Sequence, residues 1–211
     1  MWNKNQKVKG FSTEGISENF VIDGVKSFYG TSKFSSEKFI EECREYSGLS
    51  YVINRFGVIA GPSQMGKIDQ GIISYWLGGH IFDKPLYYIG YGGSGKQVRD
   101  ILHISDLVRL VELQIINWDK VKNQTFNVGG GLSNSVSLLE LTNLVQNITG
   151  IKKTIRKESE ERIADIPIYI TNNKKINTVL DWNPTRSLEC IVKDTYEWIL
   201  KNKKQLRTII S

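Results

Sequence analysis

The feature that most constrains the fold is a helix pattern that runs directly into a strand pattern near the start of the chain. From Phe28 to Ser47 the apolar residues follow approximately helical spacing, and Gly48 stands where such a helix would end. The next run, Leu49 to Ile59, contains Tyr51-Val52-Ile53 and is typical of a buried strand. A helix followed by such a strand is half of a parallel α/β unit, so we expect an α/β fold.

Further helix and strand patterns follow and become less regular toward the end of the chain. Residues 1–27 are polar and interrupted by glycines, so we expect a loop or tail there. Ser137 and Glu140 have the spacing of a capping box, which predicts that a helix begins at this point. Helices are also expected over residues 70–77, 105–117, 173–180 and 188–201, and strands over residues 85–89, 98–104, 125–128 and 152–156.

Composition places the chain among globular proteins. Its 211 residues, of which 40% are hydrophobic and 24% charged, are enough for one sizeable core. Cys43 and Cys190 lie far apart without C-x-x-C spacing, so we expect neither a disulfide framework nor a zinc site, and we expect a reducing cytoplasm. No stretch approaches the roughly 18 apolar residues of a membrane span, and the first residues lack an apolar signal core. No membrane association, targeting segment or metal site is therefore expected.

The net charge of +6 does not by itself indicate a nucleic-acid partner. Lysines are spread along the chain, apart from short clusters such as Lys201-Asn202-Lys203-Lys204, and acidic residues are mixed through every segment. The excess of positive charge is also what a pyrophosphate-binding site would need. We therefore expect no nucleic-acid binding.

A glycine-rich segment, Gly90-Tyr91-Gly92-Gly93-Ser94-Gly95, has the G-x-G-x-x-G spacing of a dinucleotide-binding turn. The residues after it have the pattern of a strand, whereas the phosphate of a dinucleotide needs a helix N-terminus directly after the glycines. Gln97 also stands where a phosphate-binding P-loop needs Ser or Thr. We therefore favour a glycine-rich turn between two strands over either phosphate-binding interpretation.

Tyr29 and Lys33 are four residues apart in the first predicted helix, so they lie on one face about a turn apart. A cation beside a phenol favours the phenolate form, and tyrosine can then serve as an acid/base near neutral pH. The same spacing also arises by chance and equally describes a solvated pair on a helix surface. The pair alone does not decide between these interpretations.

Order along the chain adds weight to the functional interpretation. The helix with Tyr29 and Lys33 leads to a strand with Arg55 near its end, and Gly61-Pro62 follows. Over residues 16–199 the chain resembles the extended short-chain dehydrogenase/reductases, that is, the NAD-dependent epimerase/dehydratase family. The other segments that carry this resemblance are Gly95 to Leu107, Phe126 to Gly130, Arg162 to Asp165, and Trp182-Asn183-Pro184. Longer segments, Asp69-Gln70-Gly71 and residues 95–103, 134–141 and 181–184, resemble the CDP-tyvelose (CDP-paratose) 2-epimerases within that family.

The resemblance implies the C-terminal part of an extended Rossmann-type fold with a mixed α/β substrate-binding lobe. Residues 28–62 would be a remnant of the Rossmann domain, and residues 63–211 would be mostly the lobe with interleaved Rossmann elements. Nothing upstream of Tyr29 resembles the family's strand, glycine turn and helix, and no catalytic Ser or Thr precedes Tyr29 in the family's manner. We therefore expect that the N-terminal dinucleotide-binding half is missing. The helix over residues 28–47 should be partly uncovered, and a homo-oligomer is expected unless a separate N-terminal half exists.

The family resemblance also implies roles at the cofactor. Tyr29 would be the catalytic acid/base, and Lys33 would assist it while it contacts the nicotinamide ribose. Phe56 falls where relatives contact the nicotinamide, and the alternative for this residue is a core aromatic. Arg55 is expected to be structural. NAD is the cofactor of the family, but we expect weak or absent NAD binding by this chain.

Substrate contacts are implied at Gln70, Arg99 and Arg162. Arg99 and Arg162 correspond to arginines that hold the substrate diphosphate, for which a guanidinium suits better than an ammonium. The alternative for each arginine is an ion pair with a nearby aspartate, and the alternative at Gln70 is that its neighbour Asp69 starts a helix. His103 is expected to be a packed strand histidine rather than a metal ligand or base.

The implied substrate is a nucleotide sugar, with a CDP-linked sugar favoured. The implied reaction is inversion at C2 by transient hydride transfer to a tightly held NAD, with no net redox change. Two alternatives stay open at this point. One is a 4-epimerase or 4,6-dehydratase of a related nucleotide sugar, and the other is a non-catalytic nucleotide-sugar-binding module.

Overall fold

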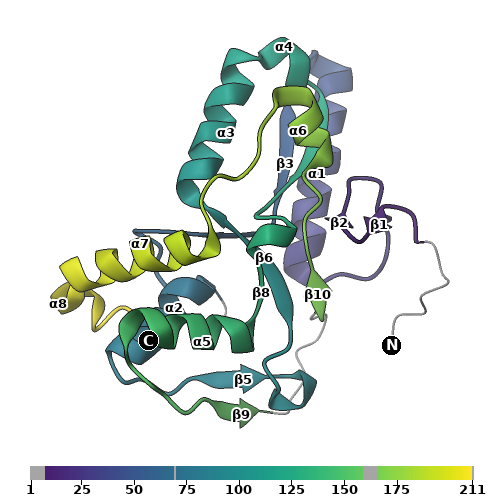
Figure 1. Cartoon of the computed structure of the whole chain (residues 1–211). Coiled ribbons are helices and arrows are strands. Elements are labelled where there is room, and N and C mark those ends of the chain that lie inside the picture. Colours follow the sequence, from purple (N-terminus) through teal and green to yellow (C-terminus); the bar gives the residue numbers. More distant parts are fainter. Residues whose placement is uncertain (1–7, 69, 159–165, 211) are drawn as a thin grey trace.

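The computed structural model describes residues 8–68, 70–158 and 166–210. Figure 1 shows helices and strands mixed throughout, with β6 running through the middle of the molecule. In this part of the chain the helices are α1 (Phe28–Ser47), α2 (Ile72–Ile81), α3 (Ile104–Ile116), α4 (Trp118–Val121), α5 (Leu138–Thr149), α6 (Lys174–Leu180), α7 (Leu188–Lys201) and α8 (Lys203–Leu206). The strands are β1 (Phe11–Ser12), β2 (Gly15–Ile16), β3 (Val52–Phe56), β4 (Val58–Ala60), β5 (Tyr87–Ile89), β6 (Val98–His103), β7 (Gln124–Val128), β8 (Ser135–Ser137), β9 (Arg156–Glu158) and β10 (Ile168–Tyr169).

Most strand pairs are parallel, which confirms the predicted α/β class. β3 pairs with β7 over its whole length, and β5 pairs with β9 in the same parallel sense. β6 is the most connected strand, since it pairs in parallel with β4 and β10 and antiparallel with β8. A parallel pair needs a long crossover connection, and α2 lies in the connection between β4 and β6.

Two hydrophobic cores lie on opposite sides of β6, because successive side chains of a strand point to opposite faces. Ile101 belongs to a core that includes residues of α2, α5 and α7, seen in the lower half of Figure 1. Its neighbour Leu102 belongs to a second core with Phe126 of β7 and Trp182. Both β6 side chains are at most 1% exposed, so a single strand anchors the two halves of the molecule.

The helix boundaries follow local capping signals in the sequence. The hydroxyl of Ser137 accepts a hydrogen bond from the Glu140 amide at 3.2 Å, and the Glu140 carboxylate accepts from the Ser137 amide at 2.8 Å. This confirms the predicted capping box at the start of α5. Gly48 ends α1 in the left-handed region (φ 71°), as its position after the helical pattern predicted.

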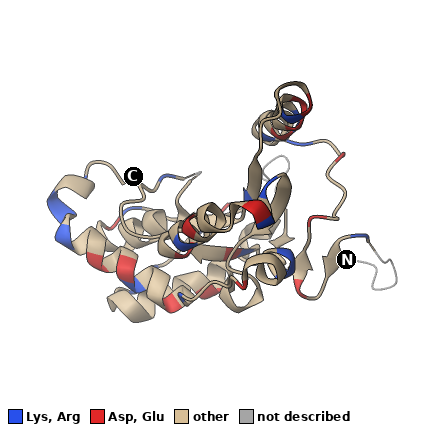
Figure 2. Ribbon diagram, turned by 90° about the horizontal axis from the view of Figure 1, so that it is seen from above, with Lys and Arg blue, Asp and Glu red and all other residues tan. Residues whose placement is uncertain are grey.

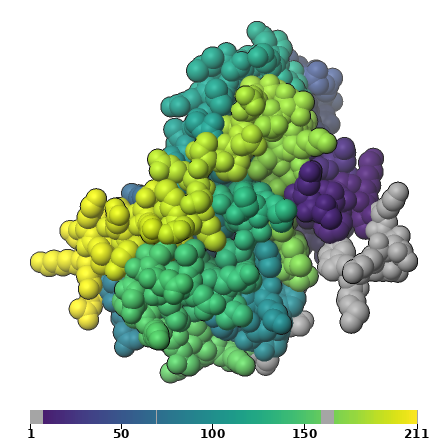
Figure 3. Space-filling view, in the orientation of Figure 1, coloured from purple at the N-terminus to yellow at the C-terminus, as the bar shows by residue number. Residues whose placement is uncertain are grey.

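Some sequence expectations differ from the structure. The single strand expected over Leu49 to Ile59 is divided at Gly57 into β3 and β4, which pair with different strands. The strand expected over residues 152–156 lies instead over Arg156–Glu158, because its partner β5 fixes the register there. The loop expected over residues 1–27 contains the β1–β2 hairpin. Ile16 in this hairpin donates to the carbonyl of Ile170 at 2.8 Å and accepts from the Asn172 amide at 3.0 Å. Figure 3 shows the hairpin (purple) against the lime-coloured residues near position 170, a contact that no local sequence pattern encodes.

Helix α1 is only weakly covered by the rest of the described chain. None of its residues is buried, and Phe28 and Tyr46 are 99% and 88% exposed. The view in Figure 2 shows α1 standing apart from the other helices, and it also shows Lys and Arg interspersed with Asp and Glu. The expectation of a partly uncovered helix over residues 28–47 is therefore confirmed. No helix in the described residues is long and apolar enough to span a membrane.

The segment after α6 is fixed to α3 by the buried carboxylate of Asp106. This carboxylate is 1% exposed and accepts from the amides of Thr185 and Arg186 at 3.0 Å and from the Thr185 hydroxyl at 2.7 Å. Burial by itself raises the pKa of Asp106, but these hydrogen bonds outweigh it and hold the pKa below its usual range. The indole of Trp182 also donates to the Asp106 carbonyl at 3.3 Å. The family-like segments around Asp106 and Trp182 therefore serve the fold.

We predict that Asp106→Asn destabilises the protein by about 2–4 kcal/mol at pH 7. The NH₂ group of asparagine would face backbone amides that now donate to a carboxylate oxygen, so these donors would lose their acceptor. Because the pKa of Asp106 is lowered in the folded protein, the carboxylate contributes its full stabilisation above the ordinary carboxyl pKa of about 3.9. This stabilisation is lost as the pH falls through the lower pKa of the folded state. Urea unfolding of wild type and variant at several pH values measures the difference.

The matched control is Asp119→Asn on α4, where the carboxylate is exposed and pairs with Lys122 at 2.7 Å. We expect little change in stability for this variant. A wild-type to Asp106→Asn difference that stayed constant down to pH 2 would contradict the assignment of the effect to the buried carboxylate.

Candidate functional site

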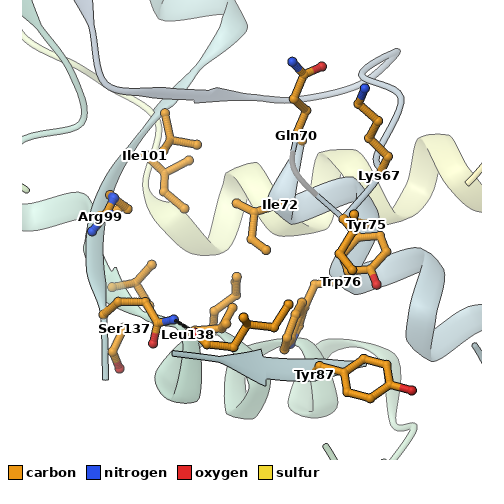
Figure 4. Close-up of a pocket in the computed structure, with 17 residues that line it drawn as sticks. Lys67, Gln70, Ile72, Tyr75, Trp76, Tyr87, Arg99, Ile101, Ser137 and Leu138 are labelled. Atoms are coloured by element: carbon orange, nitrogen blue, oxygen red, sulfur yellow. Dashed lines mark hydrogen bonds between the residues drawn. The ribbon is translucent and has the colours of Figure 1, made fainter. Parts of the chain in front are cut away.

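A cavity of about 270 Å³ opens between β4, β5, β6, the start of α2 and the start of α5. Figure 4 shows Arg99 and Ile101 on one side of it and Gln70 and Lys67 on the loop that leads into α2. Most of the wall is apolar, and the apolar lining residues include Val58, Ile72, Trp76, Val136, Leu138 and Leu141. An apolar hollow with a few polar groups at fixed places is the usual form of a small-molecule site.

Two of the residues that the sequence assigned to a substrate meet in this cavity. Arg99 lies on β6, is half-buried, and donates from Nη1 to the carbonyl of Val98 at 2.8 Å. Gln70 is exposed and is positioned by paired backbone hydrogen bonds with Lys67, at 2.9 and 3.1 Å. The structure therefore places these two residues, 29 positions apart in the sequence, in the lining of one cavity. Arg162 lies outside the described residues.

Asp100, the neighbour of Arg99, lies fully buried beside a glycine-rich segment. Its carboxylate accepts a hydrogen bond from the amide of Gly131 at 3.0 Å. Burial raises the pKa of Asp100 above its usual value, although this hydrogen bond opposes the shift. A Cβ on Gly129 would come within 2.2 Å of the Asp100 carboxylate, so only glycine fits there. This packing fixes the strand from which Arg99 projects.

Tyr29 and Lys33 lie together on α1 but do not line the cavity. The Lys33 ammonium is 5.4 Å from the centre of the Tyr29 ring, as the four-residue spacing predicted. Tyr29 is 71% exposed and Lys33 is also exposed, so both groups are open to a ligand. Phe56, at the end of β3, is half-buried and packs against the second core. Its predicted contact with a nicotinamide stays a prediction.

Arg55 has the structural role that was expected of it. Its guanidinium binds the Glu37 carboxylate of α1 in two places, with Nε to Oε1 at 2.9 Å and Nη2 to Oε2 at 2.6 Å. Such a bidentate pair is geometrically specific. It therefore ties α1, and with it Tyr29 and Lys33, to β3.

His103 is a packed histidine at the start of α3. It is 5% exposed, its Nδ1 accepts from the Ser105 amide at 3.1 Å, and its Nε2 lies 3.4 Å from the Asp194 carboxylate. Burial lowers the pKa of His103, opposed by the charge of Asp194. The hydrogen bond from the Ser105 amide caps the N-terminus of α3. The sequence did not predict this cap, because β6 sets where the ring lies relative to the start of the helix. Among the described residues, no group of three or more His, Cys, Asp or Glu side chains is arranged to hold a metal ion.

The glycine segment over residues 90–95 is a turn, as the sequence analysis favoured. Gly90, Gly92, Gly93 and Gly95 all have positive φ, and β6 rather than a helix follows. A dinucleotide phosphate therefore finds no helix N-terminus after these glycines. The dinucleotide interpretation of this segment is excluded.

Sequence reasoning missed the aromatic part of the cavity wall, which comprises Tyr75, Trp76 and Tyr87. The alternation along β5 was the available signal. Tyr87 lines the cavity, whereas Tyr88 points to the opposite face, stacks on Trp76 with ring centres 5.9 Å apart and donates to the Thr142 hydroxyl at 2.8 Å. Without the register of β5, the sequence alone could not say which tyrosine faced the cavity.

Comparison with known proteins gives consistent matches. The chain is 30% identical over 193 residues to CDP-paratose 2-epimerase of Salmonella typhi, a match that covers 87% of this chain and 54% of that protein. It is 25% identical over 196 residues to UDP-glucuronate 4-epimerase of Thermodesulfobacterium geofontis, with 91% and 56% covered. The chain thus spans about half the length of the curated relatives it matches.

Solved structures show the same relationship. UDP-glucose 4-epimerase of Thermotoga maritima, determined with UDP-glucose, superimposes with a TM-score of 0.74 at 27% identity. The match covers 83% of this chain and 54% of the Thermotoga maritima chain. UDP-glucuronic acid 4-epimerase of Bacillus cereus, determined with UDP-glucuronic acid and NAD, shares the fold with a TM-score of 0.78 at 23% identity, covering 92% and 59%. The model of the NAD dependent epimerase/dehydratase family matches residues 9–129. Because this match covers more than half of the chain, the protein belongs to the NAD dependent epimerase/dehydratase family.

Proposed function

We propose that this chain supplies the substrate-binding part of a nucleotide-sugar epimerase, with a CDP-linked sugar as substrate and C2 as the inverted centre. The observation that carries the proposal is the cavity whose wall contains both Gln70 and Arg99. Similarity to CDP-paratose 2-epimerase supports the nucleotide and the position of inversion. In this assignment residues 28–62 belong to the cofactor-binding domain, and residues 63–211 form mostly the substrate lobe. The protein would act in the cytoplasm, in keeping with Cys43 and Cys190, which are both free.

Arg99 is the proposed contact to the substrate diphosphate. Its guanidinium offers several donors in one plane, which suits phosphate oxygens. Val58 and Ile101 beside it give an apolar surface in which that charge is less screened by water. Arg162, which lies outside the described residues, is proposed to contact the diphosphate as well, and Gln70 to contact the sugar or the base.

Tyr29 is the proposed acid/base at the sugar hydroxyl. Its phenolate, stabilised by the Lys33 ammonium beside the ring, would take the hydroxyl proton, and the resulting phenol would return it after the sugar has presented its other face. NAD, when bound, supplies a reversible acceptor for the hydride of the sugar carbon. Lys33 would contact the nicotinamide ribose, and Phe56 would contact the nicotinamide.

The described residues fit only one end of NAD. Tyr29 and Lys33 are exposed and adjacent, as a contact to the nicotinamide ribose requires. The glycine turn over residues 90–95 leads into β6, so it offers no helix N-terminus to the pyrophosphate. We propose that this chain alone binds NAD weakly or not at all and does not catalyse epimerisation. The exposed face of α1 would then be covered by another α/β half or by a second copy of the chain.

Two other functions have specific support. A non-catalytic nucleotide-sugar-binding module is favoured by the separation of the cavity from Tyr29 and Lys33, neither of which lines it. A UDP-sugar 4-epimerase or a dTDP-glucose 4,6-dehydratase is favoured by the relatives with those names, which are 25–27% identical to this chain. Titration with CDP, UDP and dTDP separates the nucleotide classes.

We predict that Arg99→Ala weakens binding of both CDP and inorganic pyrophosphate by about 10- to 150-fold, which corresponds to the roughly 1.5–3 kcal/mol of a charged hydrogen bond. Both ligands should be affected because the contact is to phosphate oxygens. Isothermal titration calorimetry of the purified chain measures the two affinities. Arg44→Ala, an exposed arginine on α1, is the matched control and should leave both unchanged. Unchanged CDP affinity in Arg99→Ala would return Arg99 to a structural role.

A second prediction concerns the cofactor. The 211-residue chain should bind CDP in calorimetry but show little or no heat with NAD, because small misplacement of the nicotinamide and loss of the pyrophosphate contacts both reduce productive binding. Stoichiometric NAD in the purified protein, or measurable epimerase activity of this chain, would overturn the prediction. Binding of neither CDP nor any other nucleoside diphosphate would instead refute the proposed substrate cavity.

A further inference from the structure

An arginine on β9 contacts one of the aromatic residues at the edge of the cavity. The parallel pairing of β5 and β9 sets Arg156 opposite Tyr87. Nη1 of Arg156 donates to the Tyr87 hydroxyl at 3.2 Å, and its Cζ lies 5.8 Å from the centre of the ring. The guanidinium thus holds the tyrosine through both its hydroxyl and its ring.

The backbone under this pair is fixed by the core. Tyr88, next to Tyr87, is buried against Trp76, and the Arg156 amide donates to the Leu86 carbonyl at 2.9 Å. Figure 4 shows Tyr87 at the edge of the cavity, with Tyr75 and Trp76 nearby on α2. The strand is therefore rigid, and the side-chain torsions of the half-buried Tyr87 are the freedom that remains.

We propose that Arg156 is a positioning residue that holds the Tyr87 ring at the cavity rim, where the ring packs against the base of the bound nucleotide. The proposal rests on the proposed function, because it requires that the cavity binds a nucleotide. An aromatic face is a general platform for a nucleobase. A ring that is already held in place loses less conformational freedom when the base binds, so the base binds more tightly.

Arg156 and Arg99 then have different tasks that can be separated by experiment. Arg99 lines the cavity itself and is the proposed phosphate contact, whereas Arg156 reaches the ligand only through Tyr87. Removal of the Arg156 side chain should therefore weaken the binding of ligands that carry a base and leave the binding of ligands that consist of phosphate alone unchanged. A merely structural role would affect both kinds of ligand or neither.

The experiment titrates CDP and inorganic pyrophosphate into wild type, Arg156→Ala, Tyr87→Phe and the double variant. We expect Arg156→Ala to weaken CDP binding by about three- to tenfold and to change pyrophosphate binding by less than about twofold. Tyr87→Phe keeps the ring but removes the acceptor of the Arg156 hydrogen bond, so CDP binding should weaken in this variant too. In the Tyr87→Phe background, adding Arg156→Ala should weaken CDP binding by less than a further factor of about two, because the two changes remove one interaction.

Lys157→Ala is the control, because Lys157 is an exposed cation on the same strand and pairs in register with Tyr88 instead. It should leave CDP affinity unchanged, and thermal unfolding should show all variants folded. Equal weakening of CDP and pyrophosphate by Arg156→Ala would overturn the inference, as would an undiminished effect in the Tyr87→Phe background or no effect at all. Failure of wild type to bind CDP would refute the proposed function, and this inference with it.

Discussion

The alternation of side chains along β6 is the constraint on which the rest of the structure depends. Ile101 and Leu102 point to opposite faces, and each is fully buried in a different core. A one-residue shift of β6 would exchange these faces and disrupt both cores at once, so the register of β6 is strongly determined. The same register turns Arg99 toward the cavity and buries Asp100 beside Gly129. The candidate phosphate contact is therefore placed by the packing of its neighbours.

Residues distant in sequence are held to this central strand by buried polar groups. Asp106, just after β6, accepts hydrogen bonds from the amides of Thr185 and Arg186 and so fixes the segment between α6 and α7. The segment after the N-terminal hairpin is held to β7 instead, since the Asn127 amide donates to the half-buried Glu18 carboxylate at 2.7 Å. Carboxylates that satisfy backbone donors give such contacts a defined geometry. Several motifs shared with the family therefore explain the fold rather than the chemistry.

The two parts of the candidate site have contrasting surroundings. Arg99 lies in the wall of an apolar cavity, whereas Tyr29 and Lys33 lie on a helix that has no buried residue. The cavity is preformed by the β6 core, so its ligand needs little rearrangement of the chain. The Tyr29 end is held mainly by the ion pair between Glu37 and Arg55. The proposed nucleotide contact and the proposed proton transfer thus depend on different parts of the fold.

The sequence by itself determined the elements whose signals are local. The helix over residues 28–47, the capping box at Ser137 and the glycine turn over residues 90–95 follow from spacing and from backbone preferences within a few residues, and the structure has all three. Family motifs also predicted that Gln70 and Arg99 contact the substrate, and this stays a prediction. The structure shows that both residues line one cavity.

Only the tertiary structure decided features that depend on pairing between distant segments. The hairpin near Ile16 forms because its backbone pairs with residues 170–172, and β9 lies over Arg156–Glu158 because β5 sets its register. The aromatic wall was likewise undetermined, since the alternation of Tyr87 and Tyr88 gives one face or the other only after the strand has been placed. Local preferences act over a few residues, whereas register is fixed by burial of faces that meet only in the folded chain.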